Sequence, residues 1–203
     1  MKLNKHYDNS SIFSSIEEAL GENENSSFTD VLMNINYLNS KNSTFNIFNN
    51  PDLYLILNFQ NNGEIVFQKN NNLEVDGMKP SISEILELVD PERIKVDAIN
   101  DRKFVEFNVH QKVKPLDLIV SFKNIINTKT RGDMTVERSI AILSSNENGI
   151  PLFGLCCINK ISEPKGTEID KYNFRIKSTS NNSELAKQLE EYLGQTVTTT
   201  QNA

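Results

Sequence analysis

The chain has 203 residues, of which 37% are apolar and 24% charged. Its 21 basic and 27 acidic side chains give a formal charge of −6 at pH 7. This length and composition fit one globular domain with an appendage and exclude a chain disordered throughout. The acidic balance argues against a nucleic-acid-binding surface that covers most of the molecule.

The first 51 residues predict a helical extension. No apolar run follows the early lysines, so we expect no secretory signal and a cytoplasmic protein. No window approaches the about 18 uninterrupted apolar residues that a membrane span needs. Segments 11–20 and 27–38 instead place apolar residues at helical spacing. These residues are Ile12, Phe13, Ile16, Ala19 and Leu20, then Phe28, Val31, Leu32, Ile35 and Leu38.

Residues 52–161 predict a domain that starts with a β-hairpin. Strands at 53–59 and 64–68 flank an Asn-Gly turn, which supplies positive φ angles at low cost. Helices are expected at 81–89 and from Pro91 to about Asn100. The pattern at 104–109 fits either a helical turn or a short strand.

Three further strands are expected at 116–126, 134–143 and 152–161, with turns at 130–133 and 146–149. The first two alternate, and the third is apolar on both faces, as is typical of a central strand. One face of the alternating pair carries Leu116, Leu118, Val120 and Phe122 on one strand and Met134, Val136, Ile140 and Ile142 on the other.

Residues 162–203 predict a C-terminal strand, helix and tail. The strand is expected at 172–176 and the helix at 183–193. Leu185, Leu189 and Leu193 form the apolar stripe of that helix. Gly194 is expected to end it, and a frayed polar tail is expected to follow.

The region 52–161 resembles a PAS domain, a sensory and interaction module in which helices cover one face of a five-stranded antiparallel sheet. Asp90-Pro91-Glu92-Arg93 stands where many PAS sequences have a His-Pro-x-Asp-like turn, although Asp90 replaces the His. Segment 125–142 is similar to the usual pair of long strands. Asn148-Gly149-Ile150-Pro151 is similar to the turn before the last strand.

The same stretch resembles the N-terminal sensor half of LuxR-type transcription regulators of Bacteroidetes. The resemblance implies an α+β sensor domain in signalling or transcription regulation, without catalysis or cofactor. It implies self-association or a protein partner, with no nucleic-acid binding by this chain itself, because nothing after Ile176 is long or basic enough to be a helix-turn-helix. PAS modules often dimerise through flanking helices. Alternatively, the two terminal helices pack back onto the free face of the sheet.

In such a domain, a ligand would sit between the sheet and its covering helices. The residues expected to line that space are Leu118, Val120, Val136, Arg138 and Ile140. Arg138 stands out because a guanidinium directed into a core needs an anionic partner. That partner is either a carboxylate or phosphate ligand, or an Asp or Glu of the chain itself. A solvent-facing strand would remove the need for one.

No residues are predicted to be catalytic or to bind a metal. Cys156 and Cys157 are neighbours on a strand, so their thiols point to opposite faces and cannot share a metal ion. His6 lies in the terminal segment, and His110 is expected to be exposed. The sequence contains no nucleophile elbow, phosphate loop or His-Glu-x-x-His motif. An alternative function is a small acidic inhibitor or immunity-type protein that blocks a basic partner.

Overall fold

The computed structural model describes residues 51–129, 132–161, 174–178 and 182–200. The helices expected at 11–20 and 27–38 lie outside these residues, as does His6. Among the described residues, no helix is long and apolar enough to cross a membrane.

The described chain forms a six-stranded antiparallel sheet with helices, which confirms the α+β class. The strand order is β2-β1-β5-β4-β3-β6, so β5 is central, as its apolar sequence predicts. The strand expected at 172–176 is present from Phe174 onward as β6, which pairs with β3 at the edge of the sheet, and residues 172 and 173 lie outside the described chain. The bounds are β1 Leu53–Asn58, β2 Glu64–Asn70, β3 Leu118–Thr128, β4 Gly132–Ser145, β5 Pro151–Lys160 and β6 Phe174–Ser178.

The hairpin of β1 and β2 closes through the short 3-10 helix η1, Phe59–Asn61. The Asn58 side chain accepts a hydrogen bond from the Gln60 amide and caps this turn. Asn62 and Gly63 follow with φ angles of 54° and 77°. The Asn-Gly pair therefore adopts the left-handed backbone that its residue types predict.

Helix α3, Ile82–Leu86, is shorter than the expected segment 81–89. The Ser81 side chain accepts a hydrogen bond from the Glu84 amide, and the Glu84 carboxylate accepts one from the Ser81 amide. This reciprocal capping box fixes the beginning of the helix. Ile85 and Val89 are buried, so Val89, three residues after the end of the helix, also packs into the core.

Helix α4, Pro91–Gln111, is much longer than expected. The prediction of an end near Asn100 was wrong, and segment 104–109 is helical. Asp90 caps the beginning by accepting a hydrogen bond from the Glu92 amide, and Pro91 occupies the first turn. The helix ends only at Lys112, whose φ is 49°. Polar residues in the middle of the helix gave a false end signal because they face a polar part of the interior.

Two strand predictions need correction. Leu116 precedes β3 with a φ of 64°, and its amide donates to the Ile142 carbonyl. This left-handed residue interrupts the alternation, so Leu116 packs on the face opposite Leu118 and Val120. In the turn expected at 130–133, residues 130 and 131 lie outside the described chain, and Gly132 and Asp133 belong to β4.

The turn at 146–149 is confirmed. The Asn146 side chain accepts hydrogen bonds from the amides of Asn148 and Ile150, and Gly149 has a φ of 77°.

Helix α5, Ser183–Thr200, continues past Gly194. The predictions that Gly194 ends it and that the residues from 195 fray were wrong as far as Thr200. A glycine stops a helix where it adopts a left-handed conformation, and Gly194 does not. The surroundings of Gly194 do not require a glycine, because a Cβ at this position would meet no atom within 4 Å.

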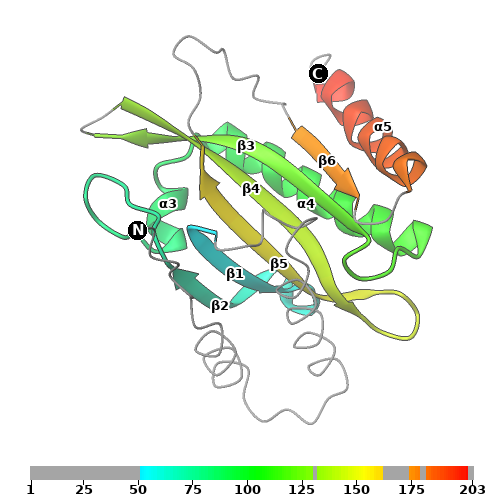
Figure 1. The fold of residues 1–203 in the computed structure, drawn as a ribbon. Coiled ribbons are helices and arrows are strands. Elements are labelled where there is room, and N and C mark those ends of the chain that lie inside the picture. Colours follow the sequence, from blue (N-terminus) through cyan, green and yellow to red (C-terminus); the bar gives the residue numbers. More distant parts are fainter. Residues whose placement is uncertain (1–50, 130–131, 162–173, 179–181, 201–203) are drawn as a thin grey trace, which may run out of the picture.

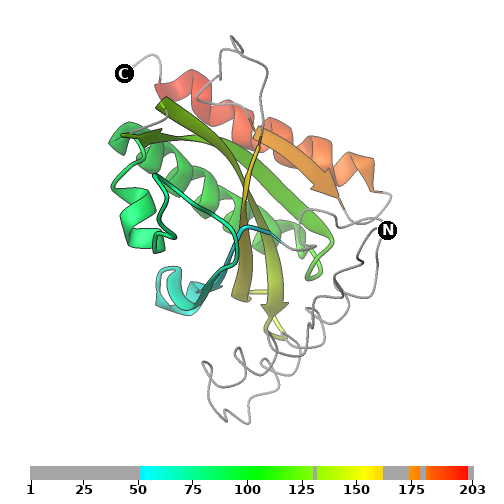
Figure 2. The same ribbon diagram turned by 60° about the vertical axis from the view of Figure 1, so that its left-hand side comes forward.

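The helices α3, α4 and α5 lie on one side of the sheet (Figures 1 and 2). We call the sheet face toward them the inner face and the opposite one the outer face. Each face carries its own apolar cluster. The inner cluster joins Leu53, Val120, Val136 and Ile140 of the sheet to Phe104 and Phe107 of α4 and to Leu189 and Leu193 of α5. Ile56, Ile119, Ala141, Leu143, Leu155 and Cys157 form the core of the outer cluster.

Candidate functional site

The two halves of α4 meet the inner face through different chemistry. The half from residue 91 to 101 directs Arg93 and Asp97 inward, at 9% and 8% exposure. The half from residue 102 to 111 directs Phe104 and Phe107 inward, at 0% and 4% exposure. We call these the charged half and the aromatic half of α4. A buried polar group is costly unless it is paired, so the contacts of the charged half define the candidate site.

Arg93 and Asp97 are joined through Asn124 of β3. Arg93 Nε donates to Asn124 Oδ1 at 2.8 Å, and Asn124 Nδ2 donates to Asp97 Oδ2 at 2.8 Å. Arg93 Nη2 also donates to the Lys123 carbonyl at 2.7 Å, and Arg93 Nε lies 3.2 Å from Asp97 Oδ1. The amide of Asn124 therefore serves both charges and ties the beginning of α4 to β3.

Asp101, one helical turn after Asp97, pairs with Arg138 of β4. Arg138 Nη1 donates to Asp101 Oδ2 at 2.7 Å, and Arg138 Nη2 donates to Asp101 Oδ1 at 2.8 Å. The guanidinium also lies 5.0 Å from the ring centre of Phe122, its cross-strand partner on β3. A two-point contact of this kind is the strong form of an Arg–carboxylate pair.

Burial and charge shift the protonation equilibria of this network. Burial raises the pKa of Asp97, although the charges of Arg138 and Arg93 oppose that effect. Burial alone would lower the pKa of Arg138, but the neighbouring Asp101 and Asp97 raise it above its ordinary value. The Arg138 guanidinium therefore keeps its charge, and burial favours the protonated form of the Asp97 carboxyl.

The structure brings the five predicted pocket residues together on the inner face. Leu118, Val120, Val136 and Ile140 are at most 3% exposed and belong to the packed inner cluster. Arg138 points inward among them and takes its anionic partner from the chain itself, which is the second of the two interpretations above. The space between these residues and α4 is filled by side chains of the inner cluster.

The sequence analysis missed Arg93, Asp97 and Asp101 as members of the site. They recur every four residues after Pro91, so they share one face of a helix. Charges at that spacing usually mark a solvent-exposed face, and a helix thought to end near Asn100 gave no reason to place Asp101 on it. An inward Arg138 on the neighbouring strand was the available signal that this face needed carboxylates.

The two cysteines lie on opposite faces, as predicted. Cys156 belongs to the inner cluster and Cys157 to the outer one, and both are buried. Burial raises the pKa of Cys156 to about 12 and that of Cys157 well above its ordinary value. Among the described residues, no group of three or more His, Cys, Asp or Glu side chains could hold a metal ion.

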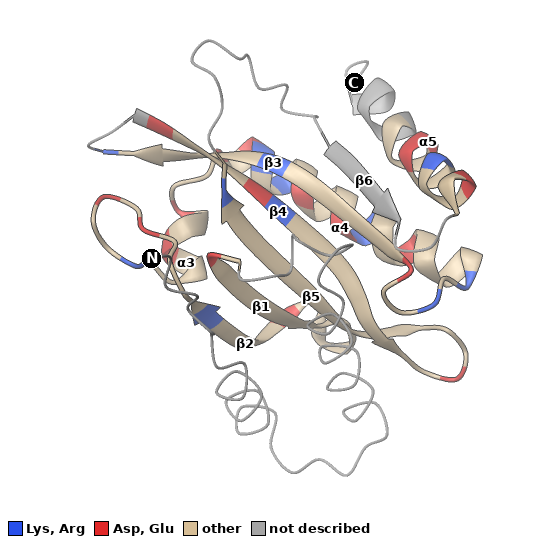
Figure 3. Cartoon of the chain, in the orientation of Figure 1, with Lys and Arg blue, Asp and Glu red and all other residues tan. Residues whose placement is uncertain are grey.

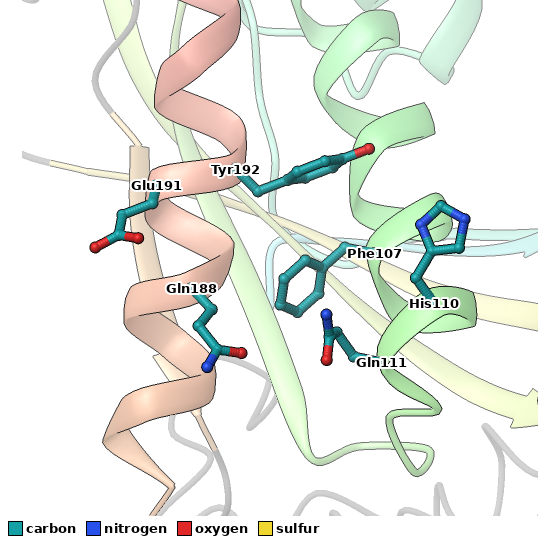
Figure 4. Close-up of a pocket in the computed structure, with 6 residues that line it drawn as sticks. All are labelled: Phe107, His110, Gln111, Gln188, Glu191 and Tyr192. Atoms are coloured by element: carbon teal, nitrogen blue, oxygen red, sulfur yellow. The ribbon is translucent and has the colours of Figure 1, made fainter.

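A second feature is a surface pocket of about 260 Å³ between α4 and α5 (Figure 4). Tyr192 projects from α5 toward α4, and its ring centre lies 5.8 Å from that of Phe107. The Tyr192 hydroxyl donates to Glu106 at 3.4 Å, and Lys103 Nζ lies 5.2 Å from the centre of the same ring. The remaining lining residues are His110, which is exposed as predicted, with Gln111, Gln188 and Glu191.

This pocket has an aromatic base and a rim of amide, imidazole and carboxylate groups. Such a lining can hold a small ligand by stacking and hydrogen bonds, but it does not bring together a nucleophile, a base and an orienting group. It lies beside the aromatic half of α4, so the network and the pocket occupy different parts of the same helix.

Comparison with known proteins adds no functional assignment. A scan against models of protein families finds no match to this chain, and a search of curated protein sequences also finds none.

Proposed function

We propose that this chain is a PAS-like sensor and interaction domain, without catalysis, in a cytoplasmic signalling or transcription-regulatory protein. The order of elements supports the proposal: a hairpin, then helices, then three long antiparallel strands, with the helices over one face of the sheet. This order agrees with the resemblance found in residues 52–161.

The observation that carries the proposal is the charged half of α4. Packed apolar side chains usually stabilise a core as well as or better than buried ion pairs do. This helix nevertheless meets the sheet through Arg93, Asp97, Asp101 and Arg138. A charged side chain in such a pair can bind another group of opposite charge instead. The apolar contacts of Phe104 and Phe107 do not select a partner by its charge. We infer that the charged half is the part of the covering helix that responds to a signal.

The chemistry of the network limits what that signal can be. A small anion with a carboxylate or phosphate group could replace Asp101 on Arg138, since a guanidinium binds either group through two parallel hydrogen bonds. Asp101 would then turn outward, where its side chain is already 32% exposed. The charged half of α4 would lose one of its attachments to β4.

The alternative of an acidic inhibitor receives less support from the described surface. On α4, the outward Glu92 and Glu106 pair with Lys95 and Arg102. Figure 3 shows acidic and basic residues interspersed along this helix. A surface that blocks a basic partner would offer carboxylates without such neutralising neighbours.

Native mass spectrometry of the purified full chain and of Arg138→Met tests the proposal. We expect the native protein to carry a small anionic adduct or to form a homodimer, and we expect Arg138→Met to lose the adduct. A bare monomer at every protein concentration, in both proteins, would contradict the sensor function. Specific capture of a basic protein by that bare monomer would favour the inhibitor instead.

A further inference from the structure

The outer face of the sheet is buried although α3, α4 and α5 all lie on the inner side (Figures 1 and 2). Its central side chains are at most 4% exposed, and they come from β1, β3, β4 and β5. A sheet face directed to water would leave such side chains accessible, so a cover is needed from outside these helices. The side chains are Ile56, Ile119, Ala141, Leu143, Leu155 and Cys157.

Two polar groups at the centre of this face, the hydroxyls of Ser121 and Ser139, suit a dry contact. The hydroxyls of Ser121 and Ser139 lie 2.8 Å apart and hydrogen-bond each other across β3 and β4. Both residues are at most 1% exposed. Because each hydroxyl already has a partner, an apolar cover can lie on them without leaving an unpaired buried group.

The chain enters the sheet from the side of the outer face. Asn159 shares this side with Cys157 by strand alternation, and its Oδ1 accepts a hydrogen bond from the Asp52 amide at 3.3 Å. The Asp52 carboxylate in turn accepts a hydrogen bond from the Lys160 amide at 2.8 Å. These contacts fix the beginning of β1 beside the central strand, on the side of the outer face.

Two long segments outside the described residues could supply the cover. Segment 162–173 connects β5 to β6, and Ile169 and Tyr172 are its large apolar residues among many charged and polar ones. Segment 1–50 carries two apolar stripes at helical spacing. Because the outer face is apolar and extends over several strands, its cover must present continuous apolar stripes. Segment 1–50 has such stripes in its sequence, and segment 162–173 does not.

We propose that residues 1–50 of the same chain dock their apolar stripes on the outer face as an intramolecular cover. The proposal does not depend on the sensor function, because it rests on the burial of the outer face and on the place where the chain enters the sheet.

Photo-crosslinking of the full-length chain tests the cover directly. Phe28, on the second apolar stripe, is replaced by p-benzoylphenylalanine, which keeps an aromatic group at that position. Tyr37 lies on the opposite side of the same predicted helix, and its replacement gives the matched control. The protein is an equal mixture of 14N- and 15N-labelled chains, so mass spectrometry separates crosslinks within one chain from those between chains.

We expect position 28 to crosslink within one chain to peptides of β4 and β5 that contain Leu143 or Leu155. We expect the variant with p-benzoylphenylalanine at position 37 to give a much lower yield of these crosslinked peptides. Mixed-isotope crosslinks to these peptides would overturn the proposal in favour of a second copy as the cover. Crosslinks from position 28 to α4 or α5, or none to the sheet, would overturn it in favour of another partner for the outer face.

Discussion

Arg138 on β4 and Asp101 on α4 form a two-point contact that joins the covering helix to one of the two central strands of the sheet. Both hydrogen bonds are short, at 2.7 and 2.8 Å, and the Arg138 side chain is 14% exposed. Asp101 is the more accessible partner, at 32%. The cost of losing one partner should therefore depend on which one is lost.

Asp101→Ala should destabilise the protein by about 2–3 kcal/mol, because it leaves a guanidinium buried without its carboxylate. Arg138→Met should cost less, since Asp101 can turn toward water and the new side chain fills the core. The double variant Asp101→Ala/Arg138→Met should recover most of the loss. Urea unfolding of the four proteins, as a double-mutant cycle, measures these differences. Additive costs would show that the two residues do not act as a pair.

Asp97 should give the protein a defined pH dependence. Because burial raises its pKa, the folded protein binds a proton there more tightly than the unfolded chain does. The resulting stabilisation is complete below about pH 4, the ordinary range of Asp, and is lost as the pH rises through the raised pKa. Asp97→Asn removes this dependence, so the stability of the variant relative to the native protein should increase with pH across that window.

Urea unfolding at a series of pH values measures the Asp97 effect. Glu87→Gln removes a carboxylate from an exposed position at the end of α3 and is the control. A stability difference between Asp97→Asn and the native protein that stays constant or falls with rising pH would refute the assignment.

Cys156 and Cys157 should be inert in the folded protein. Burial raises the pKa of Cys156 to about 12, so almost no thiolate is present near neutral pH. Cys157 is also fully buried, on the opposite face. With Ellman's reagent at pH 8, we expect no thiol release from the native protein and release from both cysteines after unfolding in urea. Rapid reaction of the native protein would mean that one face of β5 is open to solvent.

Two glycines should respond to the same substitution with opposite sign. Gly149 has a φ of 77° in the turn before β5, so Gly149→Ala should destabilise by about 1 kcal/mol. Gly194 is inside α5 with no atom near its missing side chain, so Gly194→Ala should stabilise by about 0.5–1 kcal/mol. Thermal unfolding of both variants gives the signs. Destabilisation by Gly194→Ala would indicate that α5 does not continue through this position.

Much of the sheet could be predicted because its signals are local. Alternation placed Val120, Val136 and Ile140 on one face, and residue types alone predicted the turns at Asn62 and Gly149. The length of α4 could not be predicted in this way. Its middle turns are polar because they face Asn124 and Arg138, which are distant in the sequence, so the pattern of the helix has meaning only once the sheet is formed.

Only part of the candidate site could be predicted from local signals. An inward Arg138 follows from strand alternation, and its need for an anion follows from electrostatics. The identity of that anion depends on which helix crosses the strand and at which turn, and no local pattern specifies that crossing. Leu116 shows a related limit, since one left-handed residue before β3 moved its side chain to the other face.

Amide hydrogen exchange of α4 in the full-length protein tests the central claim most directly, because it compares the charged half with the aromatic half on one helix. The account predicts faster exchange at residues 95–101 than at 104–111, and a further increase confined to 95–101 in Asp101→Asn. Uniform protection along α4, or an Asp101→Asn effect that spreads evenly over both halves, would show that the charged half does not open separately and would contradict the proposed sensor mechanism.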